Sequence, residues 1–133
     1  MKNNSVLDLL QDSSAMLQIA ANELERPDED VVALSACQCT RNSVIGFLRS
    51  YLLEKKSLFK FHNSLETLLA ECATIDPAFS SIDISCFICK AEDGDCSGGY
   101  CLAQHKVYEC YECAQMIKEF VLSKLNLNAG FLD

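Results

Sequence analysis

Proline and glycine are scarce in this chain: its 133 residues include two prolines and five glycines. An all-β domain needs frequent turns, which rely on these residues, so their scarcity favours helices. No apolar run approaches the ~20 residues that a membrane-spanning helix requires. The N-terminal stretch is interrupted by Asp8, Gln11 and Asp12, unlike the apolar region of a signal peptide. We therefore expect a cytoplasmic protein with no membrane segment.

Hydrophobic residues and negative charge are both abundant. Half of the residues are hydrophobic, which is enough for one domain, residues 1–133, with a real core. The formal net charge is −8 at neutral pH. A field of this sign repels phosphate backbones, so we expect no non-specific binding to nucleic acids.

The segment 31–56 is expected to form the central helix of the fold. Its apolar residues recur at steps of three and four but cover too wide an arc for a single buried stripe. Such a helix must be covered by other helices of the chain, by a second copy, or by both. The residues that form this pattern are Val31, Val32, Leu34, Cys37, Val44, Ile45, Phe47, Leu48, Tyr51, Leu52 and Leu53.

A first helix is predicted over residues 6–24. Ser5 and Asp8 have the spacing of a capping box, in which the two side chains bond the unpaired amides of the first turn. Pro27 ends the helix, because proline disfavours helical geometry in the residue before it.

Two further helices follow the central one. The third begins after Asn63-Ser64, carries an apolar face over 65–72 and is closed by Asp76-Pro77. The last begins somewhere within 102–106 and continues past Val121. Residues 79–103 lack periodicity and are predicted to be an irregular connection rich in cysteine and glycine. The pattern predicts an all-α fold, an up-and-down bundle of four main helices.

With this outline the chain resembles the HEPN domain family. Three segments carry the resemblance: the end of the long helix, Phe47–Lys56, then His62–Leu69, then Cys72–Phe79. The resemblance implies a bundle of four to five helices that usually dimerises through paired helices. It also implies one of three activities: metal-independent RNase, binding of nucleotides or RNA, or partnership with a nucleotidyltransferase.

RNase members of the family carry an arginine followed four to six residues later by a histidine. The arginines here are Arg26, Arg41 and Arg49, the histidines are His62 and His105, and no pair has that spacing. We therefore predict no catalytic residue. Arg41, Arg49 and His62 are candidates for ligand binding, although such arginines often pair with local carboxylates and His62 fits a helix start.

Six of the nine cysteines fall between positions 86 and 113. Cys86-x2-Cys89 and Cys110-x2-Cys113 are separated by twenty residues, close to the spacing of a four-thiolate zinc site. Cys96, Cys101 and His105 are surplus ligands. Alternatively, Cys110 lies on the apolar stripe of the last helix as a small hydrophobe, and the thiols are reduced with no site. Redox roles remain open, though a reducing cytosol disfavours disulfides.

The sequence thus predicts a non-catalytic, HEPN-like binding domain, homodimeric, whose partner is a nucleotide or a nucleotidyltransferase-type protein. The first alternative is a structural or interaction protein stabilised by zinc at Cys86, Cys89, Cys110 and Cys113; zinc is the cofactor left open. The second alternative is a metal-independent RNase.

Overall fold

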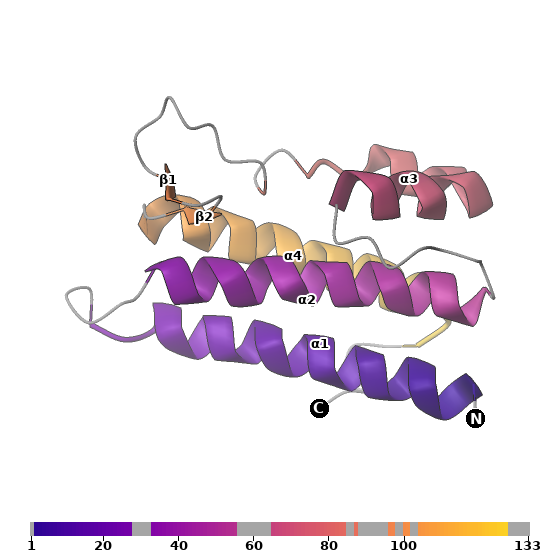
Figure 1. The fold of residues 1–133 in the computed structure, drawn as a ribbon, viewed down its shortest axis with the longest axis horizontal. Coiled ribbons are helices and arrows are strands. Elements are labelled where there is room, and N and C mark those ends of the chain that lie inside the picture. The colour runs from indigo at the N-terminus through magenta and orange to yellow at the C-terminus, as the bar shows by residue number, and fades with distance from the viewer. Residues whose placement is uncertain are drawn as a thin grey trace.

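The computed structural model describes residues 2–27, 33–55, 65–84, 87, 96–97, 100–101 and 104–127. Helices dominate this part of the chain, which confirms the predicted all-α class (Figure 1). No helix within it is both long and apolar enough to cross a membrane. The elements are α1 (Lys2–Leu24), α2 (Ala33–Glu54), α3 (Leu65–Ile75), the 3-10 helix η2 (Pro77–Ser81), strands β1 (Cys96–Ser97) and β2 (Tyr100–Cys101), and α4 (Gln104–Lys124).

Helix α2 is the centre of the fold, as its wide apolar arc predicts. It packs against α1, α3, α4 and β2, and α1 forms its most extensive interface. Every residue from Ser43 to Leu48 is buried, so α2 faces protein on several sides. The core also includes Leu10 and Leu17 of α1, Leu68 of α3, Phe79 of η2, and Ala114, Ile117 and Val121 of α4.

The burial of α2 bears on the predicted homodimer. The homodimer was predicted because part of the apolar arc of α2 was expected to stay uncovered within one chain. Val44, Ile45, Phe47, Leu48, Tyr51 and Leu52 are instead buried within a single chain, because α1, α3 and α4 together surround them. The homodimer therefore remains a prediction that needs a different surface.

Helices α1 and α2 run antiparallel (Figure 1). They approach closely where two small residues meet. Gly46 of α2 lies against Ser13 of α1, whose hydroxyl donates a hydrogen bond to Leu9 O at 2.8 Å. The N-cap predicted at Ser5 is wrong, because α1 begins at Lys2. Residues 2–4 contain no proline or glycine, so nothing in the sequence stops the helix from extending past Ser5.

Helix α3 and η2 are held to the bundle by aromatic and sulfur contacts. The Phe79 ring lies between Tyr51 of α2 and Phe120 of α4, with centroid separations of 4.5 Å and 5.0 Å. The Cys72 thiol donates to Leu48 O at 3.7 Å, and its burial raises its pKa to about 12. A thiol in this environment stays protonated and acts as part of the core.

The prediction that 79–103 is wholly irregular is wrong at two places. Residues 79–81 belong to η2, and β1 pairs with β2 in an antiparallel hairpin. The 3-10 helix forms because Asp76 caps it and proline presets the backbone at its first position. The hairpin is too short to show the period-two alternation by which a strand is recognised in a sequence.

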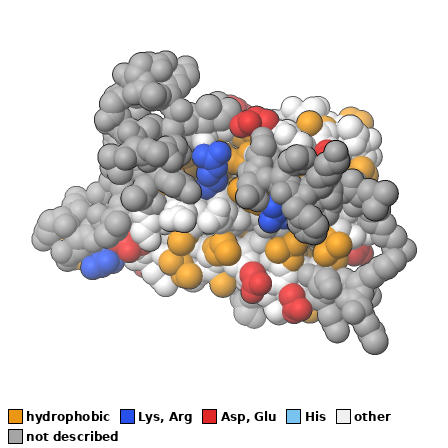
Figure 2. All heavy atoms as spheres, viewed as in Figure 1, with side chains coloured by type: hydrophobic (Ala, Val, Ile, Leu, Met, Phe, Trp, Pro, Cys, Tyr) orange, Lys and Arg blue, Asp and Glu red, His pale blue; other side chains and the backbone are white. Residues whose placement is uncertain are grey.

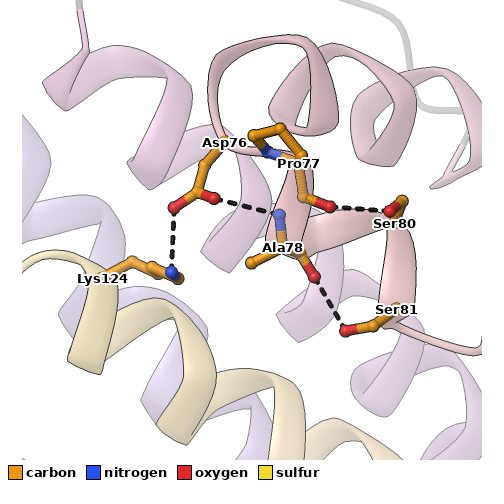
Figure 3. A network of polar contacts seen from close by, with 6 residues as sticks. All are labelled: Asp76, Pro77, Ala78, Ser80, Ser81 and Lys124. Atoms are coloured by element: carbon orange, nitrogen blue, oxygen red, sulfur yellow. Dashed lines mark hydrogen bonds and ion pairs between the residues drawn. The ribbon is translucent and has the colours of Figure 1, made fainter.

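Asp76 joins η2 to the end of α4 (Figure 3). Its carboxylate accepts a hydrogen bond from Ala78 N at 3.0 Å and pairs with Lys124 Nζ at 2.9 Å. The hydrogen bond from Lys124, together with the one from Ala78, holds the pKa of Asp76 below its ordinary value of 3.8.

This network predicts a specific pH dependence. Because the folded-state pKa lies below the unfolded one, the ionised carboxylate adds stability above about pH 3.8, and that stability is lost as pH falls through the folded-state pKa. Asp76→Asn keeps an acceptor for Ala78 N but removes the charge. We expect wild type to be more stable than the variant at neutral pH, with the gap closing in acid. Urea unfolding across this range measures the gap; a gap independent of pH would contradict the assignment.

Candidate functional site

An apolar hollow of about 300 Å³ lies between α4 and the chain that leaves η2. Its lining residues are Ser81, Ile82, Asp83, Cys113, Met116, Ile117 and Phe120. Ile117 is buried, Ile82 and Phe120 are half-buried, and Met116 is 69% exposed. A hollow of this size lies at the lower end of the range for small-molecule sites.

Two local features create the hollow. At the end of η2, Ile82 adopts an extended backbone, and its N–H bonds Phe79 O at 3.1 Å. A few residues further on, Phe87 is buried in the core. On the opposite side, Phe120 is held in place by its edge-on contact with Phe79. The floor therefore rests on well-packed core residues.

The surroundings of the hollow are acidic. Glu112 and Glu119 are exposed and lie four residues before and three residues after Met116, so they neighbour it on the surface of α4. Asp83 lines the hollow itself, and none of the described lining residues is basic. On the same helix, Lys118 bonds Ser14 Oγ at 3.1 Å and Lys124 pairs with Asp76.

The hollow can offer mainly van der Waals contact. Its polar groups are the Ser81 hydroxyl, the Asp83 carboxylate and the partly exposed Cys113 thiol. Methionine adapts its shape easily, and exposed methionines suit surfaces that accept apolar side chains. The hollow can therefore bind an apolar group, and the residues around it carry negative charge.

The arginines predicted to bind a ligand both lie on α2. Arg41 and Arg49 are partly buried and eight residues apart, or about 12 Å along the axis. Each already takes part in an interaction within the chain, so neither is a free anion contact. His62 lies outside the described residues. The Arg41, Arg49 and His62 site therefore remains a prediction.

Two of the four predicted metal ligands are described. Cys110 and Cys113 lie one turn apart on α4; Cys110 is buried in the core, and Cys113 is half-buried at the hollow. Cys86 and Cys89 lie outside the described residues. Within the described part of the chain, no group of three or more cysteine, histidine or carboxylate side chains is placed to hold a metal. The four-thiolate site that includes Cys86 and Cys89 remains a prediction.

Sequence reasoning missed the hollow. Its one visible signal is Met116, which lies beside the stripe of Val107, Cys110, Ala114, Ile117 and Val121 instead of on it. A large apolar residue on the polar side of an amphipathic helix is a weak hint of a contact surface. The other wall comes from residues without periodicity, so the sequence could not place it against α4.

No protein-family model, curated protein or solved structure matches the chain.

Proposed function

We propose that this chain is a non-catalytic interaction domain that receives an apolar side chain of a partner protein in the hollow beside α4. The observation that supports this function is the exposed Met116 at an apolar hollow whose floor is built from core residues. Binding sites for side chains are typically concave and apolar with a few polar groups, as here. A partner segment placed there would cover Met116 and the half-buried Phe120.

The charges beside the hollow suggest the chemistry of the partner. Glu112 and Glu119 flank Met116, and the whole chain carries a net charge of −8. Complementary charges steer association and reject partners of the same sign. We therefore propose a segment with one large apolar residue flanked by lysine and arginine.

The resemblance to the HEPN family supports the choice of a protein partner and nominates a nucleotidyltransferase-type protein. It also supports the up-and-down HEPN-like bundle as the finer description of the fold. Both proposals rest on the residues quoted from Phe47 to Phe79.

The first test uses a synthetic helical peptide with one tryptophan flanked by lysine and arginine. The chain contains no tryptophan, so the indole emission reports the peptide alone. We expect a blue shift on binding and an affinity that falls as salt is added, because exposed charges are screened. Met116→Lys should weaken binding about tenfold or more, which corresponds to about 1.4 kcal/mol.

The matched control is Tyr108→Lys, which adds the same charge to α4 at a residue that is 51% exposed and does not line the hollow. This variant should bind the peptide almost as wild type does. Equal loss in both variants would show a general charge effect and contradict the site. Cleavage of RNA by the purified wild-type chain without metal would contradict the non-catalytic assignment.

A homodimer is a second proposal, and exposed apolar residues of α1 support it. Met16 and Ile19 are 37% and 53% exposed and lie three residues apart on one helix face. Figure 2 shows hydrophobic side chains along the surface over α1 and α2. A pair of α1 helices related by a two-fold axis would cover Met16 and Ile19 in both copies. Light scattering that shows a monomer at all concentrations would contradict the dimer.

A further inference from the structure

The η2 segment, residues 76–83, lies along α4 and ends at the hollow. Its first residue, Asp76, pairs with Lys124 Nζ at 2.9 Å. Further along the segment, the Phe79 ring contacts the Phe120 ring with a centroid separation of 5.0 Å. The last three residues of the segment line the hollow together with residues of α4. The segment therefore follows α4 from its last turn toward its middle, and its final part forms one wall of the hollow.

The ion pair at the start of the segment has a fixed geometry. One oxygen of the Asp76 carboxylate accepts a hydrogen bond from Ala78 N at 3.0 Å, and the other pairs with Lys124 (Figure 3). The carboxylate caps η2, so it cannot turn toward solvent without leaving the amide of Ala78 unpaired. Lys124 is therefore held by an acceptor whose own position is set by the backbone.

Lys124 is linked to both walls of the hollow. On the α4 side, its Nζ lies 5.5 Å from the centroid of the Phe120 ring, which lines the hollow. On the η2 side, two hydrogen bonds continue from Asp76: Phe79 N–H donates to Asp76 O at 3.0 Å, and Ile82 N–H donates to Phe79 O at 3.1 Å. Because Ile82 lines the hollow, a shift of Asp76 is passed on to that wall.

We infer that Asp76 and Lys124 are positioning residues of the hollow, because their ion pair holds the η2 segment against α4 and so fixes the separation of the two walls. Without the pair, the start of the segment can move away from α4, and the hollow fits an apolar side chain less well. Phe79 stays buried between Tyr51 and Phe120, so the segment remains attached and the fold persists. This role of the ion pair rests on the proposed function, since binding in the hollow is what the pair controls.

The sign of the change in affinity separates positioning from a simple effect of charge. The proposed partner is cationic, so removal of a positive charge from α4 would by electrostatics alone strengthen its binding. Positioning predicts the opposite for Lys124→Gln. The matched control is Lys118→Gln, which removes the same charge from the same helix. It also breaks a hydrogen bond to Ser14 Oγ of α1 at 3.1 Å, but Lys118 does not line the hollow.

The first measurement is the affinity of the tryptophan peptide for variants that circular dichroism shows to be folded. We expect Lys124→Gln and Asp76→Asn each to weaken binding about threefold to tenfold, a usual size for residues that act outside the contact. The double variant should lose little more than either single variant, because both changes remove the same ion pair. Lys118→Gln should bind as wild type does or slightly more tightly. Unchanged or tighter binding by Lys124→Gln would overturn the inference.

The second measurement does not need the peptide. Cys113 is half-buried and lines the hollow, so its rate of alkylation by a bulky reagent reports how open the hollow is. Mass spectrometry of the peptides separates the thiols. We expect Cys113 to react faster in Lys124→Gln and in Asp76→Asn than in wild type or Lys118→Gln. Cys39, a half-buried thiol of α2 that does not line the hollow, is the internal reference and should react at the same rate in all forms.

The two measurements distinguish failure of the positioning role from failure of the proposed function. If wild type binds the peptide but neither variant changes the reactivity of Cys113, the positioning role is wrong and the proposed function stands. If both variants expose Cys113 but wild type does not bind the peptide, the proposed function is wrong and the ion pair still holds the walls together.

Discussion

Phe79→Ala is expected to lower the free energy of unfolding by about 3–5 kcal/mol, the usual cost of removing a fully buried phenylalanine. The Phe79 side chain has no exposed surface and contacts rings from two other helices, Tyr51 of α2 and Phe120 of α4. Its removal leaves a cavity at the junction of η2, α2 and α4 and takes away two aromatic contacts. Because a domain of this kind is stable by only about 5–15 kcal/mol, the loss is a large part of the total.

Urea unfolding followed by circular dichroism measures this effect. Phe79→Leu is the matched variant, since it keeps most of the apolar volume and removes only the ring; it should cost clearly less. If Phe79→Ala does not fold, the free energy of unfolding of Phe79→Leu can still be measured and compared with that of wild type. A loss below about 1 kcal/mol in Phe79→Ala would show that this ring is not part of the core.

Gly46→Ala is expected to destabilise the protein by about 1–3 kcal/mol, the usual cost of overpacking. Helix propensity alone predicts the opposite sign, because alanine is favoured over glycine inside a helix by about 1 kcal/mol. We expect the steric overlap with Ser13 to outweigh the gain in helix propensity, so that the variant is less stable. A methyl group at Gly46 would overlap Oγ of Ser13 and lie 3.0 Å from its Cβ. Ser13 is buried, and turning its hydroxyl away would break the bond to Leu9 O.

A double-mutant cycle tests the mechanism. In a Ser13→Ala background the overlap with the hydroxyl is gone, so Gly46→Ala should cost less than it does in wild type. Asn42→Ala, at an exposed position one turn earlier on α2, is the control for propensity and should be nearly neutral or stabilising. Stabilisation of wild type by Gly46→Ala would show that α1 and α2 do not approach as closely as the structure has them.

The candidate site was much less predictable than the helices. Met116 and Ile117 are adjacent in the sequence, but one is exposed and the other is buried below the hollow. Ile82 and Asp83, on the other wall, belong to a segment whose sequence shows no period. The ion pair of Asp76 with Lys124 joins residues nearly fifty positions apart. The spacing of residues within one helix cannot predict a contact between residues so far apart in the sequence.

The same limit applies to the cysteines. The repeated Cys-x2-Cys spacing predicted a zinc site at Cys86, Cys89, Cys110 and Cys113, because a sequence shows the spacing of cysteines and not their positions in space. Backbone register instead places Cys96 opposite Cys101. Cys110, predicted either as a ligand or as a small hydrophobe, is a buried member of the core.

By itself, the sequence determined that this protein is helical, where each main helix lies to within a few residues, and that the helix within 31–56 is the central one. Apolar spacing and helix-stopping residues act over a few positions, so they can be recognised without coordinates. Only the tertiary structure decided that α1, α3 and α4 cover α2 within one chain, that Gly46 meets Ser13, and that a hollow opens beside Met116. Those features depend on how each helix is rotated about its axis and on which faces meet, and both are set by the packing of the whole core.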